Sequence, residues 1–174
     1  TLPDPVDPGM LNPAWKGLRL SGDGSLRGEL AVTPAGIRQN AHANLKNISV
    51  FGDNWAIDSV NGELEITDFE KVLTAPHQQL TFANMIIGGC ELSRGNMIFH
   101  SVAPGRFLIE YAAFDGFGGR ITTANPVEID PSSPAVKLPL YAAGINLPPL
   151  LSMLGIPDAA GPAKVSGALP VEFR

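Results

Sequence analysis

The sequence has few of the residues from which chemical sites are usually built. Cys90 is its single cysteine, so no disulfide can form within the chain and no cysteine-rich metal site is present. A lone cysteine between Gly89 and Leu92 is typical of a small buried side chain. Charged residues make up 17% of the chain, the net charge is −5, and Lys and Arg are dispersed. Nucleic-acid binding needs a basic stripe that neutralises phosphates, so we expect no nucleic-acid partner.

Long apolar runs are missing too. No stretch approaches the roughly 18 apolar residues that a membrane-spanning helix needs, and no signal peptide is recognisable at Thr1. The first residues are instead rich in proline, which favours a stiff, extended segment. We interpret residues 1–15 as a linker and residues 16–174 as a single β-rich domain, and we expect the natural protein to continue upstream.

Catalytic constellations are not recognisable either. No histidine has an Asp, Cys or Ser at a spacing that suggests a triad, and the three are His42, His77 and His100. Glu63 and Glu65 share one strand face, which is typical of a solvated surface. The glycine-rich run that begins at Gly116 lacks the Lys-Ser/Thr of a phosphate-binding loop. We therefore expect no enzyme activity, no cofactor and no metal.

Short alternating apolar segments are what the chain does contain. Apolar residues make up 44% of it, and 19 glycines and 16 prolines stand singly between the segments, as turn residues do in β proteins. The pattern predicts an all-β, mainly antiparallel fold, either a curved, groove-like or partly open sheet or a sandwich, with one short helix near the C-terminus. The later strands are expected at Leu80–Ile87, Glu91–His100, Arg106–Phe114, Phe117–Thr123, Ala135–Tyr141 and Ala163–Phe173.

The first strands carry more specific signals. Residues 16–20 and 26–32 alternate on either side of Ser21-Gly22-Asp23-Gly24, which predicts a hairpin. Ile37–Val50 reads as one long strand whose apolar parity shifts at Ile48, and such a shift indicates a bulge. Trp55–Thr67 is the clearest strand.

One segment has helical punctuation. It runs from Leu147 to Gly155, with Pro148 and Pro149 at its start and glycine at its end. One apolar stripe along it contains Leu147, Leu150, Leu151 and Leu154. Such a short apolar helix must lie against something apolar, so we interpret it as a lid or plug at the open end of the sheet.

A strand type recurs in the form Gly-x-Leu-x-(Val/Ile), beginning at Gly28, Gly62 and Gly167. We interpret each glycine as a position where a facing side chain leaves no room for a larger residue. Pro170 in the last copy predicts an edge strand or a bulge, because proline cannot donate to the ladder.

The apolar face of such a sheet must be covered. The sheet could fold on itself into a closed, dry sandwich, and composition alone favours that form. Part of the face could instead stay open to a hydrophobic guest.

The segment from Ser59 to Arg174 resembles the C-terminal domain of YdbH-like proteins, within the AsmA-like group that includes TamB and YhdP. The resemblance rests on the order of several short motifs, and the helix before the last strand fits it. The motifs are Val60-Asn61-Gly62-Glu63-Leu64-Glu65-Ile66-Thr67-Asp68, Leu73-Thr74-Ala75-Pro76, Gln79-Leu80-Thr81, Gly95-Asn96-Met97-Ile98-Phe99, Phe117-Gly118-Gly119-Arg120-Ile121 and Val165-Ser166-Gly167-Ala168-Leu169-Pro170-Val171.

This resemblance implies a periplasmic segment of a Gram-negative protein that is anchored in the inner membrane by a helix outside this sequence. It implies a groove-like sheet whose apolar floor carries phospholipid between the two membranes. It also implies contacts with neighbouring domains of the same chain, and no catalytic residue. The expected lining residues of the groove are Leu64, Ile66, Leu80, Phe82, Leu138, Leu140, Val165, Leu169 and Val171.

Two other functions stay open. A closed β domain could act as a structural or protein-interaction module, and its edge strands could pair with a partner or with a second copy. The family has also been labelled for dicarboxylate transport. A dicarboxylate site needs convergent cationic side chains, for which the candidates are Arg94, Arg106 and Arg120.

Overall fold

The computed structural model describes residues 17–34, 36–68, 71–87, 89–130, 133, 135–153, 156 and 163–173. They form one antiparallel sheet in the order β1-β2-β3-β5-β6-β7-β8-β10-β11, with β4 beside β3 and β9 beside β7. The strands are β1 (Arg19–Thr33), β2 (Gly36–Phe51), β3 (Trp55–Asp68), β4 (Leu73–Thr74), β5 (Gln78–Ile87), β6 (Cys90–Ala103), β7 (Arg106–Gly116), β8 (Gly119–Thr123), β9 (Val127–Ile129), β10 (Val136–Asn146) and β11 (Lys164–Phe173).

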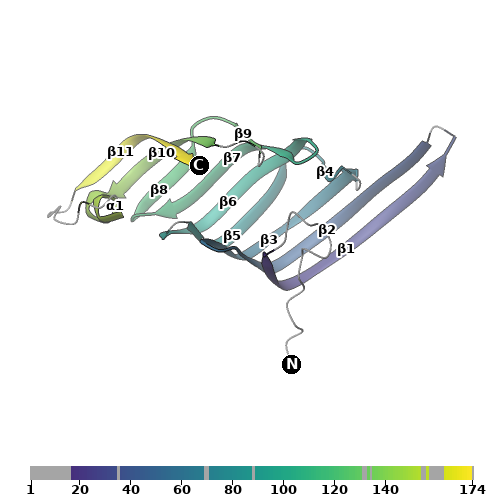
Figure 1. The fold of residues 1–174 in the computed structure, drawn as a ribbon, viewed down its shortest axis with the longest axis horizontal. Helices are drawn as coiled ribbons and strands as arrows, with labels where there is room; N and C mark the ends of the chain where they lie inside the picture. The colour runs from purple at the N-terminus through teal and green to yellow at the C-terminus, as the bar shows by residue number, and fades with distance from the viewer. Residues whose placement is uncertain are drawn as a thin grey trace, which may run out of the picture.

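The strands lie side by side in a curved sheet with β1 at one end and β11 at the other (Figure 1). Consecutive strands are mostly neighbours, because short turns of glycine and proline connect them. The β1–β2 hairpin extends beyond its neighbours, and α1 (Leu147–Met153) lies at the foot of β10. The all-β, mainly antiparallel prediction is confirmed in its open form, since the edge strands β1 and β11 do not pair with each other.

The predicted first hairpin is wrong. Residues 19–33 form one strand, and the chain reverses at Pro34, where Thr33 pairs with Gly36. Gly22 sits inside β1 at a register shift with a φ of 124°. The run around it has turn composition, but β2 continues past it without a break, so the glycine forms an irregularity in the strand.

Other local predictions fare better. The predicted bulge in the second strand is confirmed, because the β2–β3 register shifts between Leu45 and Ile48. The helix begins at Leu147 as predicted. Pro170 lies in an edge strand, as expected. The linker predicted at residues 1–15 lies outside the described residues.

A hydrophobic core forms in the half of the sheet that runs from β6 to β11. Its buried members are Leu92, Ile121, Leu140, Ala142 and Ile145, and Phe114, Leu150, Leu169 and Val171 are among the side chains that pack against it. Ile145 is only 1% exposed. Leu150 comes from α1, so the helix contributes to this core as the apolar stripe predicted.

Candidate functional site

One face of the sheet is apolar from β1 to β11, and we call it the apolar face. Cross-strand partners point to the same side, so the register identifies its members. Ala43 pairs with Leu64, Gly62 with Leu80, and Leu140 with Leu169. On the opposite, outer face lie polar pairs such as His42 with Glu65 and Glu63 with Gln79. The alternation of the sequence thus becomes a two-sided sheet.

The β1 end of the apolar face is open. Leu26, Leu30 and Val32 share a side with Gly28 and are exposed by 64%, 69% and 78% of their surface. No described element covers them. Three large aliphatic side chains in a row on a protruding hairpin form an exposed apolar surface, which is typical of a binding surface.

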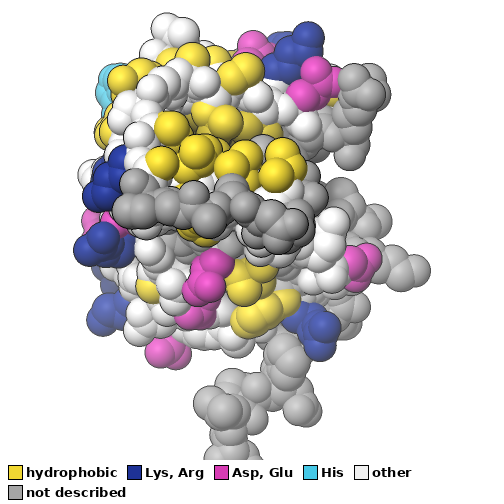
Figure 2. All heavy atoms as spheres, turned by 90° about the vertical axis from the view of Figure 1, so that its left-hand side faces the viewer, with side chains coloured by type: hydrophobic (Ala, Val, Ile, Leu, Met, Phe, Trp, Pro, Cys, Tyr) yellow, Lys and Arg dark blue, Asp and Glu magenta, His cyan; other side chains and the backbone are white. Residues whose placement is uncertain are grey.

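The β11 end of the same face is occupied. Leu140 and Ile145 are buried there, and Leu150 from α1 packs against them. Figure 2, which views the molecule from this end, shows hydrophobic side chains gathered together. A hollow of about 920 Å³ remains between β9, β10 and β11, and Leu138, Pro139, Pro170 and Val171 are among the residues that line it.

The predicted lining residues fall into two groups on the apolar face. Leu64, Ile66, Leu80 and Phe82 lie half-buried on β3 and β5. The others come together on β10 and β11, where Leu138 pairs with Val171 and Ile145 with Val165. The structure therefore places both groups on one side of the sheet, although β6 to β8 lie between them.

Glycines shape the middle of this face. A Cβ at Gly62 would lie 2.7 Å from the Leu80 side chain, and one at Gly95 would lie 1.8 Å from the Phe82 ring. The absence of a side chain lets Leu80 and Phe82 lie flat across the neighbouring strands. The predicted role of Gly62 is confirmed. The same prediction for Gly167 is wrong, since nothing lies within 4 Å of a Cβ there.

The predicted lid residues lie partly within the described chain. Leu147, Leu150 and Leu151 are half-buried in α1, and Leu150 contacts the core. Leu154 falls outside the described residues.

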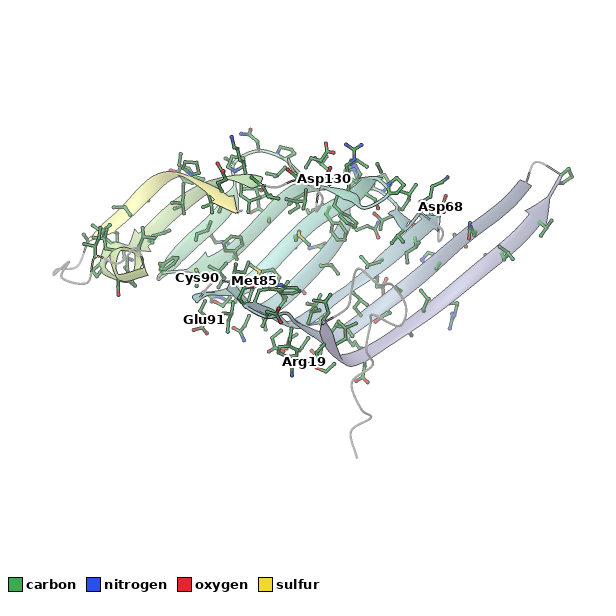
Figure 3. The ribbon with its side chains drawn as sticks, viewed as in Figure 1. Arg19, Asp68, Met85, Cys90, Glu91 and Asp130 are labelled. Atoms are coloured by element: carbon green, nitrogen blue, oxygen red, sulfur yellow. The ribbon has the colours of Figure 1, made fainter. Side chains whose placement is uncertain are left out.

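Charged residues lie on the outer face and along the two rims of the sheet, away from the apolar floor. In Figure 3, Arg19 and Glu91 lie along one rim and Asp68 and Asp130 along the other. The same view places Met85 and Cys90 close together on β5 and β6. Both pack against the core, and burial raises the pKa of the Cys90 thiol. Cys90 is thus held as a neutral, apolar side chain.

Two of the candidate arginines converge on one carboxylate of the outer face. Arg120 Nη1 lies 2.9 Å from Asp115 Oδ1, and Arg94 Nη2 lies 2.5 Å from Asp115 Oδ2. The bond from Arg120 is the main cause that lowers the pKa of Asp115. Arg106 pairs instead with Glu128 at 2.9 Å. Each arginine already has a carboxylate partner, so the geometry gives the dicarboxylate interpretation no support.

A second carboxylate links three parts of the outer face. Glu110 of β7 lies 2.6 Å from His100 Nδ1 of β6 and 2.5 Å from His77 Nδ1 of the turn before β5. The hydrogen bond with His100 is the main cause that lowers the pKa of Glu110. Sequence reasoning treated these histidines as isolated, because Glu110 is 33 residues from His77 and no motif joins them.

Within the described ranges, no group of three His, Cys, Asp or Glu side chains could hold a metal ion. No helix among the described residues is long and apolar enough to cross a membrane. The extended apolar face is therefore the feature of the described chain that most resembles a binding site.

Comparison with known proteins places this face in context. No curated protein and no solved structure gives a significant match. The family model described as intermembrane phospholipid transport protein YdbH matches residues 10–174. The match begins well before Ser59, where the resemblance carried by the motifs starts, so the family pattern extends into β1 and β2. The chain therefore belongs to the YdbH-like family.

Proposed function

We propose that the apolar face binds the acyl chains of phospholipids and forms part of a path along which they move between two membranes. The observation that carries this proposal is a continuous apolar face that is left open at Leu26, Leu30 and Val32. The family supports it, because its description names intermembrane phospholipid transport. Such a path lies in the periplasm and belongs to a protein anchored in the inner membrane.

The energetics of this face suit a lipid. Burial of apolar surface stabilises a complex by about 25 cal/mol per Å², so a few hundred Å² of acyl-chain contact contributes on the order of several kcal/mol. That contribution holds a chain without trapping it. The outer face offers no such surface near β1, where Arg27 and Glu29 alternate with the apolar residues.

In this proposal the nine predicted lining residues form two parts of the path. Leu64, Ile66, Leu80 and Phe82 form the floor at the open end. Leu138, Val165, Leu169 and Val171 border the path at the end beside α1, and Leu140 lies beneath them in the core. The helix then acts as a lid or plug, because Leu150 already packs on the core that fills this end. Lipid therefore reaches the floor from the β1 side or along the rims.

A pair of neighbouring substitutions tests the proposal. Leu30 lies on the open apolar face and Ala31 on the outer face, and both are exposed. Leu30→Glu places a charge on the lipid path, and Ala31→Glu places the same charge on the other side of the same strand. The whole protein is purified in a mild detergent, and its bound phospholipid is measured by native mass spectrometry.

We expect wild type and Ala31→Glu to retain phospholipid and Leu30→Glu to lose most of it. Neither substitution disturbs a packed contact, so both variants should fold. Wild-type protein without phospholipid, or equal retention by the two variants, would overturn the proposal.

A second function is favoured by the edges of the sheet. No described strand pairs with the outer edge of β1 or of β11, and β1 is 15 residues long. Open edges of this length accept an added strand from a neighbouring domain, a partner or a second copy. Gly28→Pro would block such pairing, because the Thr33–Gly36 closure of the hairpin aims the N–H of Gly28 away from β2, and it adds no long side chain to the apolar face. Unchanged mass of the purified assembly in light scattering would remove this function for β1.

A further inference from the structure

A row of residues with left-handed backbone crosses the sheet, and we call it the crease. Its members are Gly22 (φ 124°), Asn47 (49°), Ser59 (55°), Arg94 (49°) and Gly144 (64°) on β1, β2, β3, β6 and β10. Each lies at a break in the ladder. Such irregularities add a residue to one strand, bend it and increase its twist.

The breaks lie at one level because neighbouring strands share them. Asn47 lies opposite Gly22, and its N–H donates to the side chain of Asn61, two residues from Ser59. Ser59 lies between the pairs Asn61–Thr81 and Asp58–Asn84. On the next strands, Arg94 lies between the pairs Phe82–Gly95 and Asn84–Ser93.

Crossing the crease changes which residues of a strand face inward. A shift of one residue moves side chains to the other side of a strand, and here the sequence shifts with it. On β2, Asn44 and Ser49 both bond to outer-face side chains, Glu63 and Asp58. Leu45 pairs with Gly24, and a Cβ at Gly24 would lie 3.8 Å from Ile48 Cδ1. Leu45 and Ile48 therefore share the apolar face, three residues apart.

The same switch occurs on β5 and β6. On β5, Leu80 and Phe82 are half-buried on one side of the crease, which we call above it. Met85 and Ile87 are half-buried on the other side, below it, while Ile86 is exposed. Met85 pairs with Leu92, and both belong to the core around Ile121. Uninterrupted alternation would instead have turned Ile86 inward and Met85 outward.

We propose that the lipid path continues across the crease to the rim that carries Arg19 and Glu91. On that side of the crease, the residues that contact lipid are the ones that the shift turns toward the apolar face. This inference rests on the proposed function and adds a second part to the floor. The added contact residues are Leu20, Ile48, Val50, Ile57, Met85 and Ile87. They are linked by the pairs Leu20–Val50, Val50–Ile57 and Ile57–Met85, which run across four strands.

The occupant is an acyl chain because the strip has the chemistry of one. Each of these pairs joins two aliphatic side chains, or an aliphatic one and Met85, and no charged residue interrupts them. A protein partner would be expected to find polar groups along the strip for its own backbone. The polar groups of this level instead lie on the outer face, where Ser49 bonds to Asp58 and Ser59 N–H donates to Ser49.

Adjacent isoleucines give a sharp test. A photo-cross-linking phenylalanine derivative is introduced at Ile86 or at Ile87 of the whole protein, in cells whose phospholipids are labelled with radioactive phosphate. Both residues are isoleucine and both lie below the crease, so only the face differs. Met85 gives a second inward position in case the Ile87 variant folds poorly. Leu80 and Thr81 give the corresponding inward and outward positions above the crease.

We expect several-fold more labelled lipid at Ile87 and Met85 than at Ile86, and more at Leu80 than at Thr81. Labelling at Leu80 together with labelling at Ile86 in place of Ile87 would overturn the switched parity. Labelling at Leu80 with none at the three lower positions would show that the path stops at the crease. No labelling at any position, Leu80 included, would overturn the proposed function itself.

Discussion

The two ends of the apolar face have similar alternating sequences, but their side chains are exposed at one end and buried at the other. Near β1, Leu26, Leu30 and Val32 alternate along a strand and stay exposed. On β10, Leu138, Leu140 and Ala142 alternate in the same way, and the last two are buried. The difference is what packs against them, because Leu150 of α1 and side chains of the neighbouring strands contact the core at the β10 end.

The contrast shows how one sheet can combine stability with binding. A core at one end supplies the free energy of folding, since large side chains there lose their contact with water. The other end can then leave apolar surface uncovered at little cost to the fold. A sheet that was covered along its whole length would be more stable and would have no open surface for a guest.

The largest effect is expected from truncation in the closed end. Ile145→Ala removes a side chain that is 1% exposed, so the free energy of unfolding should fall by about 2–5 kcal/mol. Leu30→Ala at the open end should change it by less than about 0.5 kcal/mol. Urea unfolding followed by circular dichroism measures both. Equal losses would mean that the two ends are packed alike.

A smaller loss is expected when a side chain is added in the middle of the face. Gly95→Leu must displace the Phe82 ring, and overpacking of this kind costs about 1–3 kcal/mol. Gly167→Ala, on the edge strand β11, meets nothing within 4 Å and serves as the control. The midpoints of thermal unfolding separate them. A Gly95 variant as stable as the control would show that the Phe82 ring can be displaced without loss of stability.

The crease links the two ends and predicts effects of opposite sign. Gly144 in β10 has left-handed backbone and open space around it, so Gly144→Ala should cost about 1 kcal/mol through backbone strain alone. Ser59 in β3 has the same backbone hand, so Ser59→Gly should relieve strain and stabilise by a fraction of that. Chemical denaturation checks both signs. Destabilisation by Ser59→Gly would mean that its side chain makes a needed contact.

The smallest effect concerns pH. The pKa of Asp115 is lowered in the folded protein, chiefly by Arg120 and also by Arg94. The pair therefore stabilises the fold above the usual aspartate pKa of about 3.9, and this contribution is lost as the pH falls through the lowered value. Asp115→Asn should be slightly less stable than wild type at neutral pH and equal to it in strong acid. A difference that persists in acid would point to a role other than charge. The effect is small because exposed ion pairs are screened by water.

Some features of the fold could be predicted from local pattern and others could not. The parity shift at Ile48 is visible within β2 itself, so the bulge could be predicted. The left-handed backbone at Ser59 and Arg94 could not be predicted, because neither residue is the glycine or asparagine that usually occupies such a position. Gly22 was misread for the converse reason, since its neighbours have turn composition while the paired strand decides the local structure.

The candidate site divides in the same way. Strand alternation placed Leu64, Leu80 and Leu169 on one apolar side, and the register agrees. The contacts of Glu110 with His77 and His100 join strands and a turn that are distant in sequence, so no motif could reveal them. The room beside each glycine also depends on its neighbour, which is why Gly62 fitted its predicted role and Gly167 did not.

The sequence by itself determined that this protein is a β-sheet with one apolar side, because alternation and turn residues act between near neighbours along the chain. Its short motifs also indicated the family. Only the tertiary structure decided that the apolar face is exposed at β1, is covered at the β11 end, and continues without a break across the crease. Those properties depend on which strand or helix lies against each residue, and such contacts form between parts of the chain that are far apart in sequence.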